Sequence, residues 1–389
     1  MKASHGVSVG ICGATGAVGI EIISVLALRG IKVKKLVLFA SARSAGKVVS
    51  TPFGEIVIDL FSVDKAAKLD YVFLAVSGEF SLNYARELAA IPNGPVVIDN
   101  SSAFRYADGV PLVIPEINGH TLKGADGKPV RLIANPNCTT AIAAMALWPL
   151  HCEFKIKKLI VSTYQAASGA GAEGMDELKN GSQAILNEQK MEHKVFAHPL
   201  PFNLIPHIDK FQENGFTKEE MKVTWETRKI FEEPDLAVSC TAVRVPIMRA
   251  HSEAISIETA RPISPARARE LMEEAEGVDL VDNPEALQYP MPLHASKKFN
   301  VEAGRIRQSI IFGEHGLELF VSGDQLLRGA ALNAVLICEW LENPDKKAQF
   351  TKKATCSWNL CEGAGLAVAS GCVAFAAGVA LGAVLRRHK

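Results

Sequence analysis

The sequence lacks a net charge, and it also lacks any concentration of basic residues. Its 42 lysine and arginine residues balance 42 aspartate and glutamate residues over 389 positions, and they form no basic stripe. This excludes the wide positive surface that nucleic-acid-binding proteins use, so any anion should be recognised locally, in a pocket. We therefore expect a small-molecule substrate and no nucleic-acid partner. The length is too great for one typical domain and suits two.

The cysteine spacings of metal sites and redox motifs are also absent. The eight cysteines include no CxxC pair and no zinc-ligand spacing with histidine, so we predict no metal. Cys12, Cys152, Cys240 and Cys338 fall within apolar segments and are interpreted as reduced core thiols of an intracellular protein. An apolar strand begins within six residues of Met1, which leaves no room for a signal or transit peptide. We expect cytoplasmic localisation.

The C-terminus has an unusual lack of charge. Residues 363–385 contain no charged residue and are followed at once by Arg386-Arg387-His388-Lys389. About 20 helical residues cross the hydrocarbon core of a bilayer, so this run predicts a tail anchor or membrane association through residues 363–385. The alternatives are a flexible apolar tail or an additional helix packed on the protein surface. We interpret residues 346–362 as a linker and residues 363–389 as the apolar tail.

The N-terminal segment has the pattern of a dinucleotide-binding turn. An apolar strand over residues 7–12 runs into a glycine-rich turn, and an apolar helical run then extends to Leu28. Glycines at these spacings allow a tight turn and bring a pyrophosphate onto the helix N-terminus. The candidate cofactor-binding residues of this turn are Gly13, Thr15, Gly16, Ala17, Val18 and Gly19.

The end of the second strand indicates which dinucleotide binds. An NAD enzyme is expected to place Asp or Glu there, on the ribose hydroxyls, but residues 41–47 read Ser-Ala-Arg-Ser-Ala-Gly-Lys. A guanidinium and hydroxyls suit a 2′-phosphate, and the candidates are Ser41, Arg43 and Ser44. The alternative is an ordinary exposed polar loop. We favour NADP over NAD.

The order of apolar runs predicts two domains of different class. Strands and helices alternate at first, with strands near residues 7–12, 35–40, 70–76 and 96–100, which predicts a doubly wound parallel sheet. Later strands are longer and lack regular helical crossovers, which predicts a mixed α+β domain; they cover residues 157–164, 237–246 and 254–259. A last amphipathic helix, residues 324–341, could return to the first domain. The predicted division is a Rossmann-like domain of residues 1–137 plus 324–345 and a catalytic and dimerisation domain of residues 138–323.

Cys138 is the candidate nucleophile. It lies between an Asn135-Pro136-Asn137 turn, which cannot continue a helix, and an apolar helical run reaching Leu150. Unpaired backbone N–H groups and the helix dipole at this position should favour the thiolate over the thiol. The alternative is a small buried residue at a helix cap.

Further residues could serve a thiol chemistry. Arg244 lies near the end of a strand, and a short connection then presents His251, which could exchange protons with a thiolate unless it is merely structural. Residues 163–171 read as a strand ending in a small-residue loop, either a turn or a place where a flat ring approaches. Glu219 and Lys222 begin a helix after Thr217, and such a charge cluster is usually a solvated face.

Together these motifs show that the chain resembles the aspartate-semialdehyde dehydrogenase family across roughly residues 5 to 345, most closely the form common in Gram-positive bacteria. Order and spacing are both kept. The motifs are the Gly13–Gly19 turn, Ser41-Ala42-Arg43-Ser44-Ala45-Gly46, Asp99-Asn100-Ser101-Ser102-Ala103-Phe104-Arg105, Asn135-Pro136-Asn137-Cys138, Gln165 with Ser168-Gly169, Glu219 with Lys222, and Arg244 with His251.

The resemblance implies NADPH-dependent reductive dephosphorylation of L-aspartyl 4-phosphate to L-aspartate 4-semialdehyde and inorganic phosphate, in lysine, threonine, methionine and isoleucine biosynthesis. It implies that Cys138 is the nucleophile, His251 the acid/base, and Gln165 the residue that orients the acyl group. For the substrate it implies Glu219 at the ammonium, Arg244 at the carboxylate, and Arg105, Asn137 and Lys222 at the phosphate. For the cofactor it adds Ser77, Ser168, Gly169 and Gln325.

The family is dimeric or tetrameric, so we expect a homodimer or homotetramer, and the tail after about residue 350 departs from its pattern. Two alternatives remain. The first is an N-acetyl-glutamyl-phosphate reductase, which shares the thioester chemistry but whose substrate has no ammonium for Glu219. The second is a catalytically silent, membrane-tethered binding protein. In the enzyme, we expect Cys138 and His251 to form a thiolate–imidazolium pair.

Overall fold

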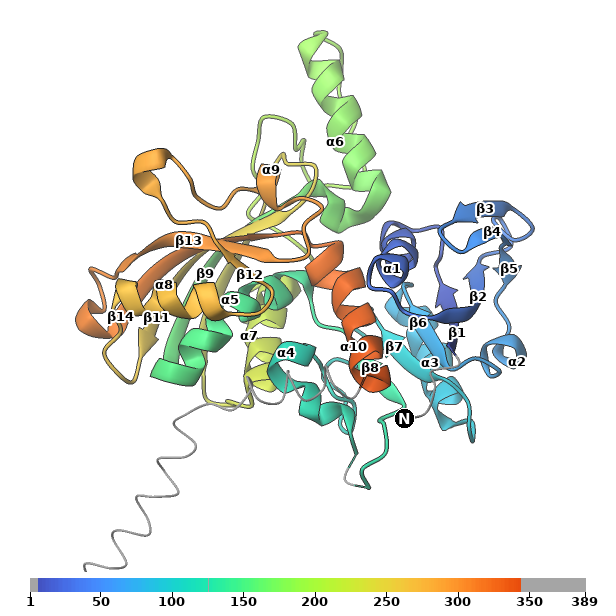
Figure 1. Ribbon diagram of the computed structural model, residues 1–389. Helices are drawn as coiled ribbons and strands as arrows, with labels where there is room; N and C mark the ends of the chain where they lie inside the picture. Colours follow the sequence, from blue (N-terminus) through green and yellow to red (C-terminus); the bar gives the residue numbers. More distant parts are fainter. Residues whose placement is uncertain (1–5, 125, 344–389) are drawn as a thin grey trace, which may run out of the picture.

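The computed structural model describes residues 6–124 and 126–343, which form two six-stranded sheets and a two-stranded hairpin, joined by helices (Figure 1). The interpretations of residues 346–362 as a linker and of 363–389 as an apolar tail lie outside the described residues, so membrane association through 363–385 stays a prediction. Within the described ranges, no helix combines the length and apolarity of a membrane span.

The first sheet is entirely parallel, as predicted. Its apolar runs form strands because they are buried on both faces, and alternate residues of one strand face opposite sides: Tyr71 and Phe73 pack into one core, whereas Val72 and Leu74 pack into another. The spatial order is β5 (Asp59–Leu60), β2 (Val33–Ala40), β1 (Val7–Cys12), β6 (Tyr71–Leu74), β7 (Val96–Asp99), β8 (Leu132–Ala134).

Helices cover both faces of this sheet, which makes it doubly wound. Helix α1 (Ala17–Leu28) and helix α10 (Leu332–Glu342) contribute to the core that contains Tyr71, and α3 (Gly78–Ala90) contributes to the opposite core. The last helix therefore packs against α1, far from it in sequence (Figure 1). Smaller elements flank the sheet: α2 (Val63–Ala66), α4 (Pro115–Asn118) and the β3–β4 hairpin (Val48–Thr51, Gly54–Val57).

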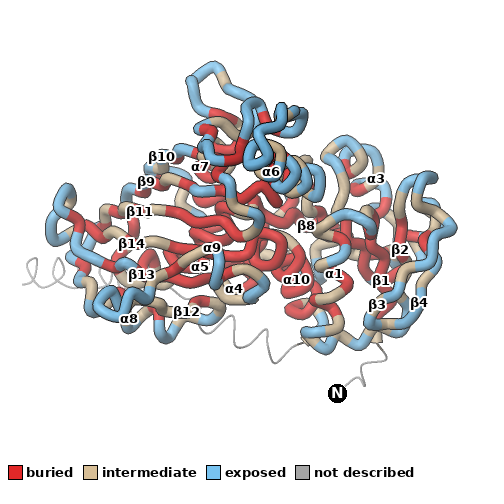
Figure 2. Tube along the Cα trace, turned by 90° about the horizontal axis from the view of Figure 1, so that it is seen from above, coloured by how far each residue is buried: buried red, intermediate tan, exposed pale blue. Residues whose placement is uncertain are grey.

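The second sheet is mixed, as predicted, and is buried mainly on one face. Along β11 the apolar residues Ile255 and Ile257 are buried, whereas Ala254 and Ser256, which alternate with them, are half-buried. Figure 2 shows the resulting buried layer between this sheet and α5. The spatial order is β10 (Ala237–Arg244), β9 (Ile156–Gln165), β11 (His251–Thr259), β14 (Gly316–Gly323), β13 (Val301–Gln308), β12 (Val278–Leu280).

The second domain contradicts the expectation that its strands lack helical crossovers. Strands β9 and β10 pair in parallel, so a crossover joins them, and it contains two helices that sequence reasoning did not treat as a crossover. The helices of this domain are α5 (Cys138–Phe154), α6 (Gly171–Leu186), α7 (Lys218–Phe231), α8 (Pro265–Glu274) and α9 (Pro292–Ala295). Helix α6 projects away from the second sheet (Figure 1).

The cysteines follow the prediction with one exception. Cys12, Cys240 and Cys338 are buried free thiols. Burial raises the pKa of each of them, which keeps them protonated. Cys152 is only half-buried and is disulfide-bonded, so its interpretation as a reduced core thiol is wrong.

Candidate active site

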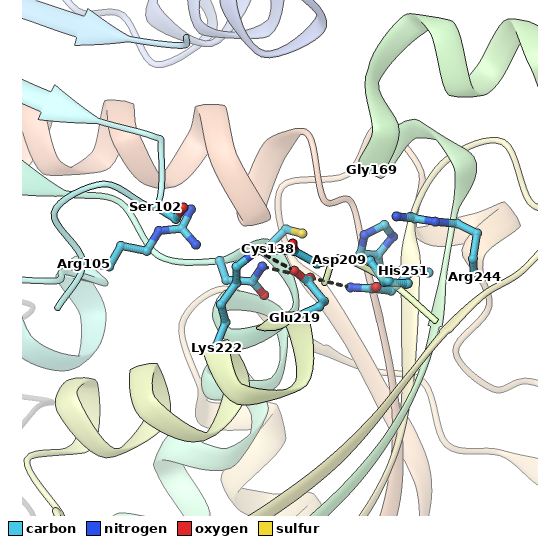
Figure 3. A pocket seen from close by; sticks show the side chains of 12 residues that line it. Ser102, Arg105, Cys138, Gly169, Asp209, Glu219, Lys222, Arg244 and His251 are labelled. Atoms are coloured by element: carbon cyan, nitrogen blue, oxygen red, sulfur yellow. Dashed lines mark hydrogen bonds and ion pairs between the residues drawn. The ribbon is translucent and has the colours of Figure 1, made fainter. Parts of the chain in front are cut away.

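A cavity of about 310 Å³ opens around Cys138. It brings together residues from a loop after β7, the start of α5, the end of β9, helix α7 and the start of β11, which are far apart in sequence. In Figure 3, Cys138 lies between Arg105 on one side and His251 with Arg244 on the other. The lining residues are Ser102, Arg105, Asn137, Cys138, Gln165, Gly169, Ile208, Asp209, Glu219, Lys222, Arg244 and His251.

Cys138 is the first residue of α5, as predicted. Asn137 caps the helix, and its side-chain oxygen accepts hydrogen bonds from the backbone N–H groups of Thr139 (3.0 Å) and Thr140 (3.3 Å). The preceding turn is held by Asn135, whose side chain donates to the carbonyl of Ala330 (3.2 Å). The thiol therefore occupies a fixed position at the N-terminus of a buried helix.

A glycine allows the last helical region to approach the nucleophile. A π-helical segment, Leu327–Ala331, precedes α10, so the α-helix predicted from residue 324 begins later than expected. A Cβ atom on Gly329 would lie 2.5 Å from the Cβ of Cys138, closer than such atoms can approach. Gly329 is thus required by the packing around Cys138.

Helix α7 delivers two charges to the cavity. Thr217 and Glu220 form a capping box at its start, which fixes the first turn, and Glu219 is buried there rather than solvated. The Lys222 ammonium lies 2.9 Å from Glu219 and 2.8 Å from Asp209. Burial alone would raise the pKa of Glu219, but Lys222 and hydrogen bonds from Asn137 and Gln165 lower it to about 2. The carboxylate is therefore ionised.

Gln165 links the nucleophile helix to α7. Its side-chain nitrogen donates to the hydroxyl of Thr139 and to Glu219 (3.1 Å). Its side-chain oxygen is buried and has no partner within the described part of the chain. A buried unpaired acceptor beside a thiol is suited to a donor on a ligand.

His251 is buried at the start of β11, and its ring is oriented by the backbone. The Nδ1 atom accepts a hydrogen bond from the N–H of Ala166 at 3.0 Å, which leaves Nε2 to carry the proton of the neutral ring. Burial, and then the charge of Arg244, lower the pKa of His251 to about 3. A Cβ on Gly169 would lie 3.3 Å from Nε2, so the glycine keeps this face of the ring accessible.

Arg244 lies beside His251, and its guanidinium keeps N–H groups that have no acceptor among the described residues. Nη1 donates to the carbonyl of Ala166 at 2.6 Å, and Cζ lies 5.7 Å from the centre of the Phe196 ring. Burial lowers the pKa of Arg244, although the nearby Glu219 carboxylate opposes this effect. An arginine with free N–H groups suits two-point binding of a carboxylate.

The ionisation state that the structure favours for Cys138 is not the predicted thiolate. Burial, and then the negative charge of Glu219, raise the pKa of Cys138 to about 11, although Arg105, Arg244 and Lys222 oppose them. With the pKa of His251 lowered as well, the two groups rest as a neutral thiol and a neutral imidazole. The expected thiolate–imidazolium pair is therefore not favoured, because desolvation outweighs the effect of the nearby cations on Cys138.

The candidate cofactor residues of the first domain gather at the carboxyl edge of its parallel sheet. Gly13 has φ +81°, and a Cβ there would lie 2.1 Å from the carbonyl oxygen of Ala75. The N–H of Gly13 donates to the carbonyl of Phe39, which puts the turn beside the end of β2 and the Ser41–Ser44 loop. Helix α1 begins after Gly16 with no side-chain cap and no acidic residue in its first turn. Its free N–H groups therefore fit a pyrophosphate.

The remaining residues of this group divide between two places. Thr15, Ala17, Val18 and Gly19 belong to the same turn and helix start, and Ser41 and Arg43 are exposed beside it. Ser77 caps α3 by accepting from the N–H of Phe80, at the carboxyl end of β6. Ser168 instead precedes Gly169, which lines the cavity, and it contacts Gln325. Gln325 donates to the Ser168 hydroxyl and accepts from the N–H of Ala250.

Sequence reasoning missed several residues of the site. Ser102, Ile208 and Asp209 line the cavity, and Glu226 and Gly329 support residues that line it. No sequence signal marks Asp209, which lies in a loop with φ +69°. Within residues 6–124 and 126–343, no group of three or more His, Cys, Asp or Glu side chains could hold a metal ion.

Comparison with known proteins assigns both halves of the chain. The family model described as "Semialdehyde dehydrogenase, NAD binding domain" matches residues 8–125, and "Semialdehyde dehydrogenase, dimerisation domain" matches residues 147–328. Among relatives, an aspartate-semialdehyde dehydrogenase of Aquifex aeolicus is 44% identical over 86% of this chain and 98% of its own length. One from Bacillus subtilis is 41% identical over 87% of this chain and 98% of its own.

A solved structure is similar as well. The chain is 38% identical to aspartate semialdehyde dehydrogenase II of Vibrio cholerae, crystallised as a complex with ASA, with a TM-score of 0.82 over 87% of this chain and 98% of that one. The two family models together match most of the chain, and the relatives are matched over nearly their whole length. Both comparisons indicate the same family. The chain belongs to the aspartate-semialdehyde dehydrogenase family.

Proposed function

We propose that this enzyme catalyses the NADPH-dependent reductive dephosphorylation of L-aspartyl 4-phosphate, which yields L-aspartate 4-semialdehyde and inorganic phosphate. The observation that carries the proposal is a single cavity in which a thiol at a helix start, a buried imidazole and charges of both signs converge. Membership of the aspartate-semialdehyde dehydrogenase family supports the same reaction.

The charges of the cavity match the three ionised groups of the substrate. Glu219 and Asp209 are ionised carboxylates for the ammonium, and the Arg244 guanidinium suits the α-carboxylate. Arg105 and Lys222, with the side chain of Asn137, suit the phosphate. An N-acylated substrate has no ammonium to offer the two carboxylates, which disfavours an N-acetyl-glutamyl-phosphate reductase.

The chemistry begins at Cys138. Its sulfur attacks the acyl carbon, the carbon–oxygen bond to phosphate breaks, and the thiol proton leaves with the phosphate as hydrogenphosphate, which leaves a thioester on the protein. When bound, NADPH supplies the hydride that reduces this thioester. The Nε2–H of His251 donates to the oxygen on which negative charge develops, and one proton restores the thiol as the aldehyde departs. Gln165 orients the acyl group.

The cofactor assignment rests on the first domain. The uncapped start of α1 and the Gly13–Gly19 turn would hold the pyrophosphate, and Ser41, Arg43 and Ser44 would hold the 2′-phosphate of NADP. The Arg43 side chain is exposed and has no ion pair within the described ranges, so it is free for a ligand. Ser77, Ser168, Gly169 and Gln325 would lie along the nicotinamide half.

The decisive test is phosphate-dependent NADP reduction by the full-length protein, with L-aspartate semialdehyde and N-acetyl-glutamate semialdehyde offered separately. We expect turnover of the first substrate only, and loss of turnover by orders of magnitude in Cys138→Ser and Cys138→Ala, because a serine hydroxyl is a much weaker acid and nucleophile than a thiol and alanine has no nucleophile. Preference for the second substrate would overturn the assignment. Activity of Cys138→Ser within about tenfold of the wild type would overturn the assignment of Cys138 as the nucleophile.

We also propose that the chain works as a homodimer or homotetramer through residues 138–323. The matched dimerisation domain, residues 147–328, supports this assembly. So does the outer face of the mixed sheet, where Ile160 and Tyr164 are 46% and 39% exposed. Light scattering of the full-length protein as it leaves a size-exclusion column would measure the mass of the particle. A monomer at micromolar concentration would contradict the proposal.

A further inference from the structure

Glu226 is a fully buried carboxylate that lies behind the cavity without lining it. It is on α7, four residues after Lys222 and seven residues after Glu219, so all three share one helix face. Its side chain is 0% exposed. A buried carboxylate is costly unless its oxygens are satisfied, so its partners identify its purpose.

The two oxygens of Glu226 serve two different parts of the site. Oε1 accepts from Nη1 of Arg105 at 3.0 Å and from the hydroxyl of Tyr106 at 3.1 Å. Oε2 accepts from the backbone N–H of Asn137 at 2.6 Å. Asn137 caps the helix that begins with Cys138, so one side chain connects the candidate phosphate ligand to the residue before the nucleophile.

The Arg105 guanidinium is held on three sides. Nε donates to the carbonyl of Asn135 (2.9 Å), Nη1 to Glu226, and Nη2 to the carbonyl of Asn100 (3.0 Å). A guanidinium has five N–H groups, so two have no partner among the described residues, one on each Nη atom. Two N–H groups on neighbouring Nη atoms suit an anion with two oxygens, and Arg105 lines the cavity (Figure 3).

We propose that Glu226 is a positioning residue that prepares the phosphate subsite, holding Arg105 and the Asn137 backbone in register with each other. This inference rests on the proposed function. Without the carboxylate, the Arg105 side chain, only 8% exposed, would lose its ion pair and turn toward other acceptors. The Asn137 N–H would lose its acceptor at the same time, and the cap before Cys138 would loosen. The arrangement fixes the distance between the phosphate subsite and the sulfur of Cys138 before the substrate binds.

The test uses steady-state kinetics of the full-length protein with L-aspartate semialdehyde, NADP and inorganic phosphate. In Glu226→Gln we expect the KM for phosphate to rise at least tenfold and kcat to fall, with the KM for NADP within twofold of the wild type. Tyr106→Phe is the matched control, since it removes one hydrogen bond to the same oxygen but leaves Arg105 and Asn137 bound, and all its constants should stay within twofold. Equal increases in every KM, or no change in the KM for phosphate, would overturn the inference.

A double-mutant cycle separates positioning from general destabilisation. In an Arg105→Lys background the phosphate ligand is already altered, so Glu226→Gln should raise the KM for phosphate less than twofold further. The same tenfold increase in both backgrounds would overturn the inference. If circular dichroism shows that Glu226→Gln does not fold, Glu226→Asp takes its place. Its shorter carboxylate should raise the KM for phosphate at least threefold, and an unchanged KM would overturn the inference.

The two proposals fail in different ways. Wild-type protein without phosphate-dependent turnover would overturn the proposed function, and this inference with it. Wild-type turnover of L-aspartate semialdehyde combined with an unchanged phosphate KM in the Glu226 variants would overturn only the role of Glu226.

Discussion

The Nδ1 atom of His251 accepts a hydrogen bond of 3.0 Å from the backbone N–H of Ala166. A backbone amide only donates here, so the ring nitrogen facing it must be unprotonated, and the neutral ring carries its proton on Nε2. The same residue, Ala166, accepts from Arg244 through its carbonyl. The backbone of one residue thus orients both the acid/base and the carboxylate ligand of the proposed site.

His251 should therefore stay neutral over the working pH range. Its pKa is lowered to about 3 by burial and then by Arg244, so it binds a proton only well below pH 5. We expect ¹⁵N NMR of the folded protein to show an unprotonated Nδ1 and a protonated Nε2 from pH 5 to pH 9. Titration of this ring near pH 6.5 would contradict the assignment, and His251→Gln identifies its signals.

Cys138 should react slowly with alkylating agents at neutral pH. Burial and Glu219 raise its pKa to about 11, so the thiolate fraction increases with pH. We expect the rate of iodoacetamide labelling at Cys138 to rise about tenfold per pH unit between pH 7 and pH 9. Peptide mass spectrometry measures the rate, with Cys138→Ser as the blank. A rate that levels off below pH 8 would show that the thiolate already dominates.

Gly329→Ala should impair the enzyme although the residue does not line the cavity. The new methyl group would meet the Cβ of Cys138 at 2.5 Å, which forces the nucleophile or the π-helical segment to move. Overpacking of this kind costs about 1–3 kcal/mol, so we expect a lower Tm and at least a tenfold lower kcat. The control is Gly78→Ala, where the nearest atom to the new Cβ lies 3.9 Å away. Similar effects of the two variants would refute the argument.

Arg43→Ala should weaken NADP binding selectively. A hydrogen bond to a charged group contributes about 1.5–3 kcal/mol, so the KM for NADP should rise about 10- to 150-fold, whereas the KM for NAD should stay within about twofold. The control is Lys32→Ala, which also removes one positive charge. Lys32 is exposed and precedes the first residue of β2, whereas Arg43 follows the last, so neither constant should change. An equal loss of both cofactors in Arg43→Ala would argue against 2′-phosphate recognition.

The first domain could be predicted from the sequence because its signals are local. Apolar runs such as residues 7–12 form strands buried on both faces, and the Gly13 turn that follows needs glycine for its positive φ. The pairing of β9 with β10 could not be predicted in the same way. It joins segments more than 70 residues apart, and their parallel register depends on how the intervening α6 and α7 pack.

The residues of the candidate site could likewise be predicted only in part. The resemblance named Cys138, His251 and their charged companions, and the structure places them around one cavity. It could not identify Glu226, whose importance comes from contacts with Arg105 and Asn137, 121 and 89 positions away. The roles proposed for these residues stay predictions until the kinetic tests are made.

The sequence by itself determined which elements form and which chemical groups are available, because helix caps, glycine turns and apolar periodicity act over a few residues. Only the tertiary structure decided the ionisation of those groups. The pKa of Cys138 is raised and that of His251 lowered because burial removes water from both and brings Glu219 and Arg244 beside them. Desolvation and charge act through space, so they depend on neighbours that no local pattern of residues specifies.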